Sequence, residues 1–325
     1  MKVPILYIVF NRPTETRRSF EVLRKIQPSK LYIAADGDRV NRVADASNTK
    51  EVREIATTVD WPCEVKTLFQ PINLGCRVAV EAALRWFFEN EEQGIILEDD
   101  IIPNKAFFDF CSVMLERYKN DNNIFSVNGC SIGYQNAQTA YGLTKYFNMW
   151  GWAAWRRSYQ LVQQTWNNYD GSDIKKDNVV TNALKLSLAP AGNTLWLDHW
   201  RQIFTKIYHR QIDTWDYQWM YTVLKTGSFC VRPSQNYIIN IGFGENATHH
   251  TFTKSPICNF KYTADEYRDD SNLTPVVNND FEIEQVAKMV NAVPVKTNKE
   301  ILASFIPKSF KTVLKSMLKQ KENQM

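Results

Sequence analysis

The segment Gly94-Ile95-Ile96-Leu97-Glu98-Asp99-Asp100-Ile101-Ile102-Pro103 places three consecutive acids between two aliphatic runs. The apolar residues 94–97 are typical of a buried strand, so the three acids mark the end of that strand. Carboxylates next to apolar walls are costly unless cations or hydrogen bonds compensate their charge. Because side chains alternate along a strand, we expect Glu98 and Asp100 on one face and Asp99 on the other.

Three similar runs precede this strand at intervals of about 30 residues, with helical patterns between them. They cover residues 3–10, 31–35 and 64–69. Strands that alternate with helices predict right-handed crossovers and a mainly parallel sheet covered by helices on both faces, an α/β fold. Such a sheet binds ligands beyond the carboxyl ends of its strands, where the strand order reverses.

Apolar periodicity predicts four helices around this sheet. Asn48 and Glu51 have the spacing of a capping box at the start of the second helix. The third helix, residues 77–88, is apolar over most of its circumference, so we expect it to be buried. The first, second and fourth helices carry the apolar positions Phe20, Leu23 and Ile26; Val52, Ile55, Ala56 and Val59; and Phe107, Phe110, Cys111, Met114, Leu115 and Tyr118.

The acidic triplet predicts a site for a hard divalent ion, Mn²⁺ or Mg²⁺. Such ions bind through one or two carboxylates and the phosphates of a substrate, and they supply the charge that the acids need. The alternative, a carboxylate or amide that caps the next helix, suits Asp99 or Asn104 but does not explain all three acids.

Polar residues also follow the first two strands, as Asn11-Arg12-Pro13 and Asp36-Gly37-Asp38. At these strand ends Arg12 can offset carboxylate or phosphate charge, and Asp36 can accept hydrogen bonds from a ligand. Asp-Gly is also a common turn, so a purely structural role for Asp36 stays open. Neither a dinucleotide fingerprint nor a P-loop occurs in the sequence, so phosphates would be bound mainly by the metal.

Residues 124–260 contain eight of the ten tryptophans and are expected to shape a cleft. Asp216 lies between Trp215 and Trp219, and an acid among aromatic rings suits a general base. A structural Asp that caps a helix or binds an indole is the alternative. Trp150-Gly151-Trp152 resembles a stacking platform, although tryptophans more often belong to the core.

The stretch of residues 240–250 is polar and carries glycines, as a lid would. Its His249 or His250 is a candidate for contact with a metal or a phosphate, and a plain surface position is the alternative.

The charge of the chain is concentrated at its C-terminal end. Residues 301–325 hold five lysines and one acid, which accounts for the formal net charge of +4, so the remaining 300 residues are neutral. This balance argues against nucleic acid as a partner. Apolar residues opposite the lysines predict an amphipathic helix over residues 301–321, bound to an anionic bilayer, to the protein body or to a second subunit.

The N-terminal apolar run is short and has no small-residue cleavage site, so it is expected to form a strand and not a signal peptide. The sequence has no apolar stretch of 18 residues, so we expect no membrane-spanning helix. The six cysteines are scattered, which indicates reduced thiols.

Taken in order, these motifs resemble those of GT-A fold glycosyltransferases, most closely the N-acetylglucosaminyltransferase I type with its Glu-Asp-Asp motif. The resemblance covers residues 3–252 and implies transfer from a nucleotide sugar, a UDP-sugar, with inversion at the sugar. It implies nucleotide contacts by Arg12, Asp36 and Glu98, metal on Asp100 and a catalytic base at Asp216, which follows Trp215. From the residues themselves we add Asp99 and His249 to the predicted nucleotide-sugar contacts, and we predict an acceptor site at Trp150, Gly151, Trp152 and Trp215.

The family's Trp-Asp-Asp-Trp stands here as Trp-Asp-Tyr-Gln-Trp, so Asp213 remains an alternative base. The resemblance further implies a nucleotide-binding half at residues 1–123, an acceptor half at residues 124–260 and a helical extension at residues 261–325. Without the membrane anchor of Golgi members, the chain resembles a cytoplasmic bacterial enzyme, peripheral at the membrane, that builds polysaccharide or a lipid-linked glycan. A sugar-phosphate nucleotidyltransferase and a non-catalytic glycan-binding protein are the alternatives.

Overall fold

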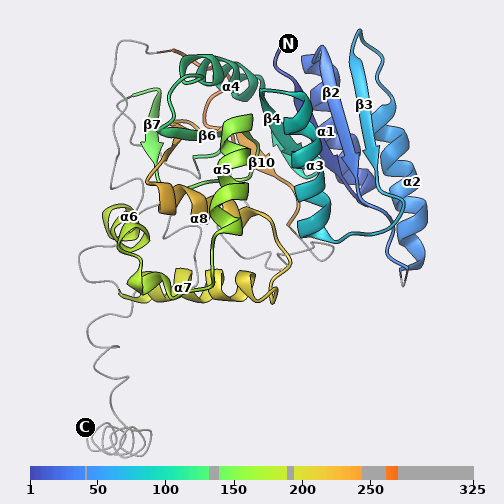
Figure 1. Ribbon diagram of the computed structural model, residues 1–325. Coiled ribbons are helices and arrows are strands. Elements are labelled where there is room, and N and C mark those ends of the chain that lie inside the picture. Colours follow the sequence, from blue (N-terminus) through green and yellow to red (C-terminus); the bar gives the residue numbers. More distant parts are fainter. Residues whose placement is uncertain (41, 132–138, 189–193, 244–260, 270–325) are drawn as a thin grey trace, which may run out of the picture. The chain divides into compact units, whose positions relative to one another are not determined.

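The structure of the protein is a computed structural model that describes residues 1–40, 42–131, 139–188, 194–243 and 261–269 (Figure 1). The chain divides into two compact units, residues 1–289 and 290–325, and every described residue belongs to the first unit. The expected extension from residue 270 onward, with its amphipathic helix, lies outside the described residues. The division into halves at residue 124 stays a prediction.

Eight strands form one mixed sheet in the order β3-β2-β1-β4-β8-β6-β9-β7. The strands β1 to β4 are parallel to one another, and β6 is parallel to β9, whereas β8 and β7 run antiparallel to their neighbours. A second, two-stranded sheet pairs β10 with β5. The strands are β1 (Ile5–Val9), β2 (Lys30–Ala35), β3 (Glu64–Phe69), β4 (Gln93–Glu98), β5 (Ile101–Pro103), β6 (Ile124–Asn128), β7 (Tyr141–Thr144), β8 (Trp152–Trp155), β9 (Phe229–Pro233) and β10 (Ile238–Asn240).

Helices cover both faces of the large sheet (Figure 1). Apolar residues of α1, α2 and α4 share one core cluster with β1, β2 and β4. On the other face the ring of Tyr32 packs edge-on against Phe87 of α3, and Phe88 of α3 stacks on Tyr159 of α5. The helices are α1 (Pro13–Ile26), α2 (Val43–Thr57), α3 (Cys76–Asn90), α4 (Lys105–Arg117), α5 (Arg156–Asn167), a 3-10 turn (Ile174–Lys176), α6 (Asn178–Leu188), α7 (Thr194–Tyr208) and α8 (Asp216–Thr226).

The predicted α/β fold class is confirmed, and each of the four predicted strands is present in the parallel part of the sheet. The four predicted helices are present as α1 to α4, and Asn104 caps α4 by accepting a hydrogen bond from the amide of Phe107. The predicted capping box is wrong, because α2 begins at Val43 and so contains Asn48 and Glu51 in its interior. The buried Asp45, held by Arg39 and Asn11, fixes an earlier start for this helix.

The third helix is only partly buried. In α3 the side chains of Val80, Ala83, Leu84, Phe87 and Phe88 are buried, and the other face is partly exposed. The prediction that this helix is buried around most of its circumference is therefore wrong. Only one face of α3 is buried.

Strand β1 lies between β2 and β4, which places a reversal of strand order at its carboxyl end. The chain runs outward from β1 through β2 to β3 and then returns to add β4 on the other side. This arrangement is the switch point at which open α/β sheets leave a crevice for a ligand. No helix among the described residues is long and apolar enough to cross a membrane.

Candidate functional site

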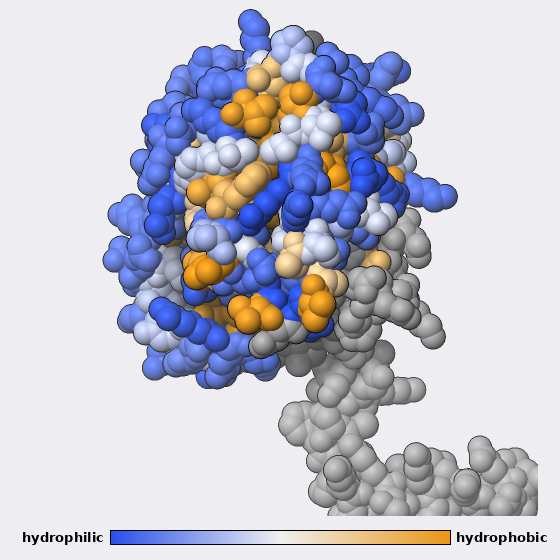
Figure 2. All heavy atoms as spheres, turned by 90° about the vertical axis from the view of Figure 1, so that its right-hand side faces the viewer, coloured by the Kyte–Doolittle hydropathy of each residue, from blue (hydrophilic) through white to orange (hydrophobic). Residues whose placement is uncertain are grey.

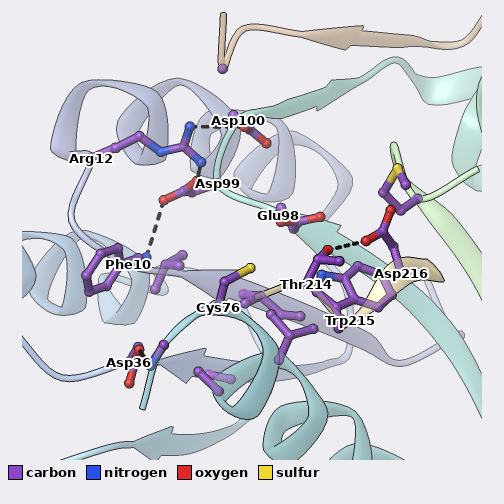
Figure 3. A pocket seen from close by; sticks show the side chains of 18 of the residues that line it. Phe10, Arg12, Asp36, Cys76, Glu98, Asp99, Asp100, Thr214, Trp215 and Asp216 are labelled. Carbon is purple, nitrogen blue, oxygen red and sulfur yellow. Dashed lines mark hydrogen bonds and ion pairs between the residues drawn. The ribbon is translucent and has the colours of Figure 1, made fainter. Parts of the chain in front are cut away.

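A cavity of about 630 Å³ opens at this switch point, beyond the carboxyl ends of β1, β2 and β4 (Figure 3). Its walls come from distant parts of the sequence: the ends and loops of the parallel strands, and the segments of residues 149–150, 212–217 and 240–243. Of the residues expected to act in the site, those that line the cavity are Arg12, Asp36, Glu98, Asp99, Asp100, Trp150, Trp215 and Asp216, together with Asp213.

Strand β4 ends within the acidic triplet. β4 ends at Glu98, and Asp99 and Asp100 form a turn before β5. Both of these carboxylates bind the guanidinium of Arg12, Asp100 at 3.0 Å, whereas Glu98 lies apart from them (Figure 3). The expected alternation, with Asp99 opposite the other two acids, is therefore wrong, because the extended backbone on which it depends stops one residue earlier.

Arg12 and Asp99 connect the loop after β1 to the turn after β4. Asp99 accepts hydrogen bonds from Arg12 and, at 3.3 Å, from the backbone amide of Phe10. The carbonyl oxygen of Asp99 accepts a third bond, at 2.8 Å, from the hydroxyl of Ser19 in α1. These contacts hold Arg12 and the triplet in one rigid unit at the switch point.

The triplet carries more negative charge than Arg12 can neutralise. Burial raises the pKa of the Glu98 carboxyl well above its usual range, and the charges of Asp100 and Asp99 raise it further. Burial also raises the pKa of Asp99 to about 6, against the opposing charge of Arg12. Three carboxylates beside one guanidinium make a place where an additional cation would be stabilised.

Asp100 suits a divalent ion of the kind that takes one protein carboxylate and several phosphate or water oxygens. The described residues contain no cluster of three or more His, Cys, Asp or Glu side chains that could enclose a metal. Gly242 follows β10 and lies directly against Asp100, where a Cβ would overlap the Oδ2 atom. This glycine leaves the Asp100 carboxylate room beside the cavity.

Asp36 organises a neighbouring loop. Its carboxylate accepts hydrogen bonds from the amides of Leu74 at 2.9 Å and Gly75 at 3.1 Å, and from the side chain of Asn73 at 2.9 Å. A Cβ on Gly37 would overlap the backbone of Ile72, so the Asp-Gly pair also permits this close approach. The structural reading of Asp36 as a turn residue is therefore supported, although its side chain also lines the cavity.

The segment of residues 212–217 brings two more acids to the cavity. Asp216 is the first residue of α8, and its carboxylate accepts a hydrogen bond from the hydroxyl of Thr214. A carboxylate in the first turn of a helix is stabilised by the helix dipole. The side chain of Asp213 is 59% exposed, and its nearest cation is Arg77, with 3.9 Å between Nε and Oδ1. Asp216 is thus the more firmly positioned of the two candidate bases.

The two tryptophans on either side of Gly151 have different surroundings. Trp150 lines the cavity and contacts Phe243, with 5.6 Å between the ring centroids. Trp152 is fully buried and stacks on Trp215, so its predicted role in the acceptor site is replaced by a role in the core. Gly151 is not among the cavity-lining residues, and its φ of +61° explains the glycine.

A cation–aromatic pair in the wall of the cavity was not predicted from the sequence. The guanidinium of Arg39 lies 5.2 Å from the ring centroid of Phe10, and both residues line the cavity. Asp45 fixes the position of Arg39 and also accepts a bond of 2.8 Å from Asn11. The signal in the sequence was Phe10 itself, an aromatic residue at the very end of a buried strand. His249 and His250 lie outside the described residues.

No protein-family model matches the sequence, and no curated protein matches it. Among solved structures, similarity was found to the mannosyltransferase PcManGT from Pyrobaculum calidifontis in complex with GDP-Man and Mn²⁺, at 10% identity and a TM-score of 0.36 over 70% of this chain and 69% of that one. Mouse xyloside xylosyltransferase 1 in its apo form has 8% identity and a TM-score of 0.33 over 70% and 82%. HddC from Yersinia pseudotuberculosis has 9% identity and a TM-score of 0.30 over 48% and 77%. Two of these three neighbours are glycosyltransferases.

Proposed function

We propose that the protein is a metal-dependent, inverting glycosyltransferase that moves a sugar from a nucleoside-diphosphate sugar, a UDP-sugar, to a hydroxyl group of an acceptor. One observation carries the proposal: a single cavity holds two separate acidic groups, the Arg12-bound turn of Asp99 and Asp100 at the switch point, and Asp216 at the start of α8. The strand order β3-β2-β1-β4 followed by the antiparallel β8 is compatible with the GT-A fold that the sequence motifs imply.

On the donor side, Asp100 would hold Mn²⁺ or Mg²⁺ together with the diphosphate of the donor. A divalent ion bound there supplies positive charge to the leaving diphosphate as a Lewis acid. Glu98 would accept hydrogen bonds from the nucleoside. Asp99 accepts a hydrogen bond from Arg12, and this ion pair determines the charge of the donor side of the cavity. Arg39 and Phe10 offer a flat, cationic surface beside it.

On the acceptor side, Asp216 would remove the proton of the acceptor hydroxyl. The hydroxyl oxygen then forms a bond to the anomeric carbon as the bond from that carbon to the diphosphate breaks, and the configuration inverts. Thr214 donates a hydrogen bond to Asp216 and thereby fixes the orientation of the carboxylate. Trp150 and Trp215 supply the aromatic surface that the acceptor sugar would contact.

The proposal is tested by separating donor binding from transfer. A panel of nucleotide sugars is screened by thermal shift with and without Mn²⁺, and a stabilising donor is then used in transfer assays. We expect Asp100→Ala to abolish the Mn²⁺-dependent shift. Asp216→Asn should keep that shift and lower transfer by about 10²–10⁴-fold, the range for loss of a general base.

Asp109→Asn, at an exposed position in α4, serves as the control. Normal transfer by Asp216→Asn would rule out this base and direct attention to Asp213. The absence of stabilisation by every nucleotide sugar in the panel would contradict the proposed function itself.

We further propose that the acceptor belongs to a bacterial surface polysaccharide or a lipid-linked glycan, and that the enzyme is cytoplasmic and peripheral at the membrane. The support is the alternation of apolar residues and lysines in residues 301–321 of the sequence. Flotation with anionic liposomes, with and without residues 301–325, tests the contact. Equal flotation of the two forms would contradict it.

A further inference from the structure

The charges of the cavity are unevenly distributed between its two sides. Of the described residues that line it, the basic ones are Arg12 and Arg39, and both belong to the strand-end loops of the donor side. Both are engaged by acids, Arg12 by the triplet and Arg39 by Asp45. The charged residues on the other side, in the segment of residues 212–217, are the acids Asp213 and Asp216.

Asp213 lies at the rim of this acidic side. Its Oδ2 atom is 2.9 Å from the position that a Cβ on Gly75 would take, so it rests on the loop that Asp36 fixes. Arg77 lies 3.9 Å from Asp213 but makes a closer pair, at 3.1 Å, with Glu81. One guanidinium therefore serves two acids, and Asp213 keeps net negative charge toward the cavity.

The thiol of Cys76 lies in the cavity between its two sides, near Asp36, Glu98 and Thr214 (Figure 3). Its pKa is raised to about 12, first by burial and then by the charges of Glu98, Asp213 and Asp216. Cys76 is thus a natural probe of the electrostatic potential in the cavity.

We infer that the acceptor side of the cavity accepts sugars that are neutral or cationic and excludes those that carry a carboxylate, sulfate or phosphate on the reacting sugar, with Asp213 as the residue that sets this specificity. The inference rests on the proposed function, because it concerns the acceptor of that reaction. An anionic group there would lose water and face the carboxylates of Asp213 and Asp216, and the described part of this wall contributes no basic residue. Neutral hydroxyl groups would instead donate hydrogen bonds to the same carboxylates.

The potential can be measured without knowing the acceptor. Methanethiosulfonates that differ only in charge, with a trimethylammonium or a sulfonate group, are reacted with the full chain at pH 8. The Cys76 thiolate attacks the sulfenyl sulfur, a disulfide forms, and methanesulfinate leaves. Because the same thiolate attacks both reagents, the ratio of the two rates reports the local potential and not the thiol pKa.

We expect the ratio of the cationic to the anionic reaction rate to be about tenfold higher at Cys76 than at Cys63. Cys63 precedes β3 and so lies at the amino ends of the parallel strands, away from the cavity. Asp213→Asn should lower the ratio at Cys76 severalfold, and the control Asp109→Asn should not change it. A ratio at Cys76 no higher than at Cys63, or one that Asp213→Asn leaves unchanged, would overturn the inference.

Binding of matched sugars completes the test. p-Nitrophenyl β-glucoside and the corresponding glucuronide are compared by saturation-transfer NMR with the protein saturated with UDP and Mn²⁺. The glucoside should bind the native chain at least about tenfold more tightly, and Asp213→Asn should narrow this difference. Preference for the glucuronide would overturn the inference.

The two proposals fail separately. If no nucleotide sugar binds but the ratio of reagent rates at Cys76 is as expected, the inferred charge selectivity is supported and the proposed glycosyl transfer is contradicted. If a donor binds with Mn²⁺ but the ratio of reagent rates is the same at Cys76 and Cys63, the proposed glycosyl transfer is supported and this inference is contradicted.

Discussion

The carboxylate of Asp36 accepts a hydrogen bond of 3.1 Å from the backbone amide of Gly75, 39 residues further along the chain. Through this bond, the end of β2 fixes the residue that immediately precedes α3. Gly75 in turn lies against Asp213, so the loop connects the donor side of the cavity to the acceptor side.

Replacement of Asp36 by Asn should destabilise the protein. The amide side chain has one acceptor oxygen where the carboxylate has two, so at least one of the amides of Leu74 and Gly75 loses its partner. We expect a loss of about 1–3 kcal/mol in the free energy of unfolding, measured by urea denaturation. The exposed Asp38→Asn is the matched control, and equal stability of the two variants would show that the loop does not depend on this carboxylate.

Replacement of Arg12 by Met should leave the acidic triplet without its cation. A buried charge cluster that loses one partner costs about 3–5 kcal/mol. Mn²⁺ should restore part of this loss, because it supplies positive charge at the same place. Thermal unfolding is therefore followed with and without Mn²⁺, and we expect the ion to raise the Tm of Arg12→Met more than that of the native chain.

Arg18→Met, at an exposed position in the helix α1 that follows Arg12, is the control for the loss of an arginine in this part of the chain. If both variants lose the same stability, or if Mn²⁺ acts equally on Arg12→Met and the native chain, the charge balance of the triplet has been misread.

Alkylation of Cys76 should depend steeply on pH. Burial and the charges of nearby acids raise the pKa of this thiol to about 12, so the thiolate fraction increases about tenfold per pH unit throughout the range from 7 to 10. An ordinary thiol, with a pKa near ~8.5, begins to level off within this range. The rate with iodoacetamide, followed by peptide mass spectrometry, should therefore show no plateau at Cys76. A plateau near pH 9 would mean that the thiol lies in a more polar or less acidic setting.

The parallel part of the fold could be predicted because each of its strands and helices carries its own apolar pattern. Residues 64–69 and 94–97, for example, were recognised from local sequence and form β3 and β4. The antiparallel strands β7, β8 and β10 are short, at three to four residues, and are defined by pairing with strands far away in the sequence. No local pattern specifies such partners.

The composition of the site was easier to predict than its geometry. Glu98, Asp99 and Asp100 stood out because acids are rare next to apolar runs, but their orientation depends on where β4 ends and on Arg12, a contact across 87 residues. The predicted acceptor role of Trp152 was wrong for a related reason. A tryptophan suits a binding surface and a core equally well, and its contact with Trp215 depends on tertiary packing.

Gly242 should be essential for the metal-dependent step although it carries no functional group. A Cβ at this position would overlap Asp100 Oδ2 and lie 3.0 Å from Arg12 Nη1, so Gly242→Ala must displace the carboxylate or the end of β10. The strand is held by the pairing of β10 with β5 and by the bond of 2.9 Å from the amide of Ile241 to the carbonyl of Asp100, so the carboxylate is expected to move. We expect Mn²⁺-dependent donor binding to fall at least about tenfold, measured by calorimetry.

Gly227→Ala is the matched control for this substitution. Gly227 ends α8 with a φ of +67° and has open space around it, so an alanine there strains the backbone by about 1 kcal/mol without touching the cavity. Gly227→Ala should therefore lower the Tm and keep Mn²⁺-dependent binding, whereas Gly242→Ala should lose the binding in a folded protein. Unchanged donor affinity in Gly242→Ala would show that Asp100 is not the residue through which the metal holds the donor.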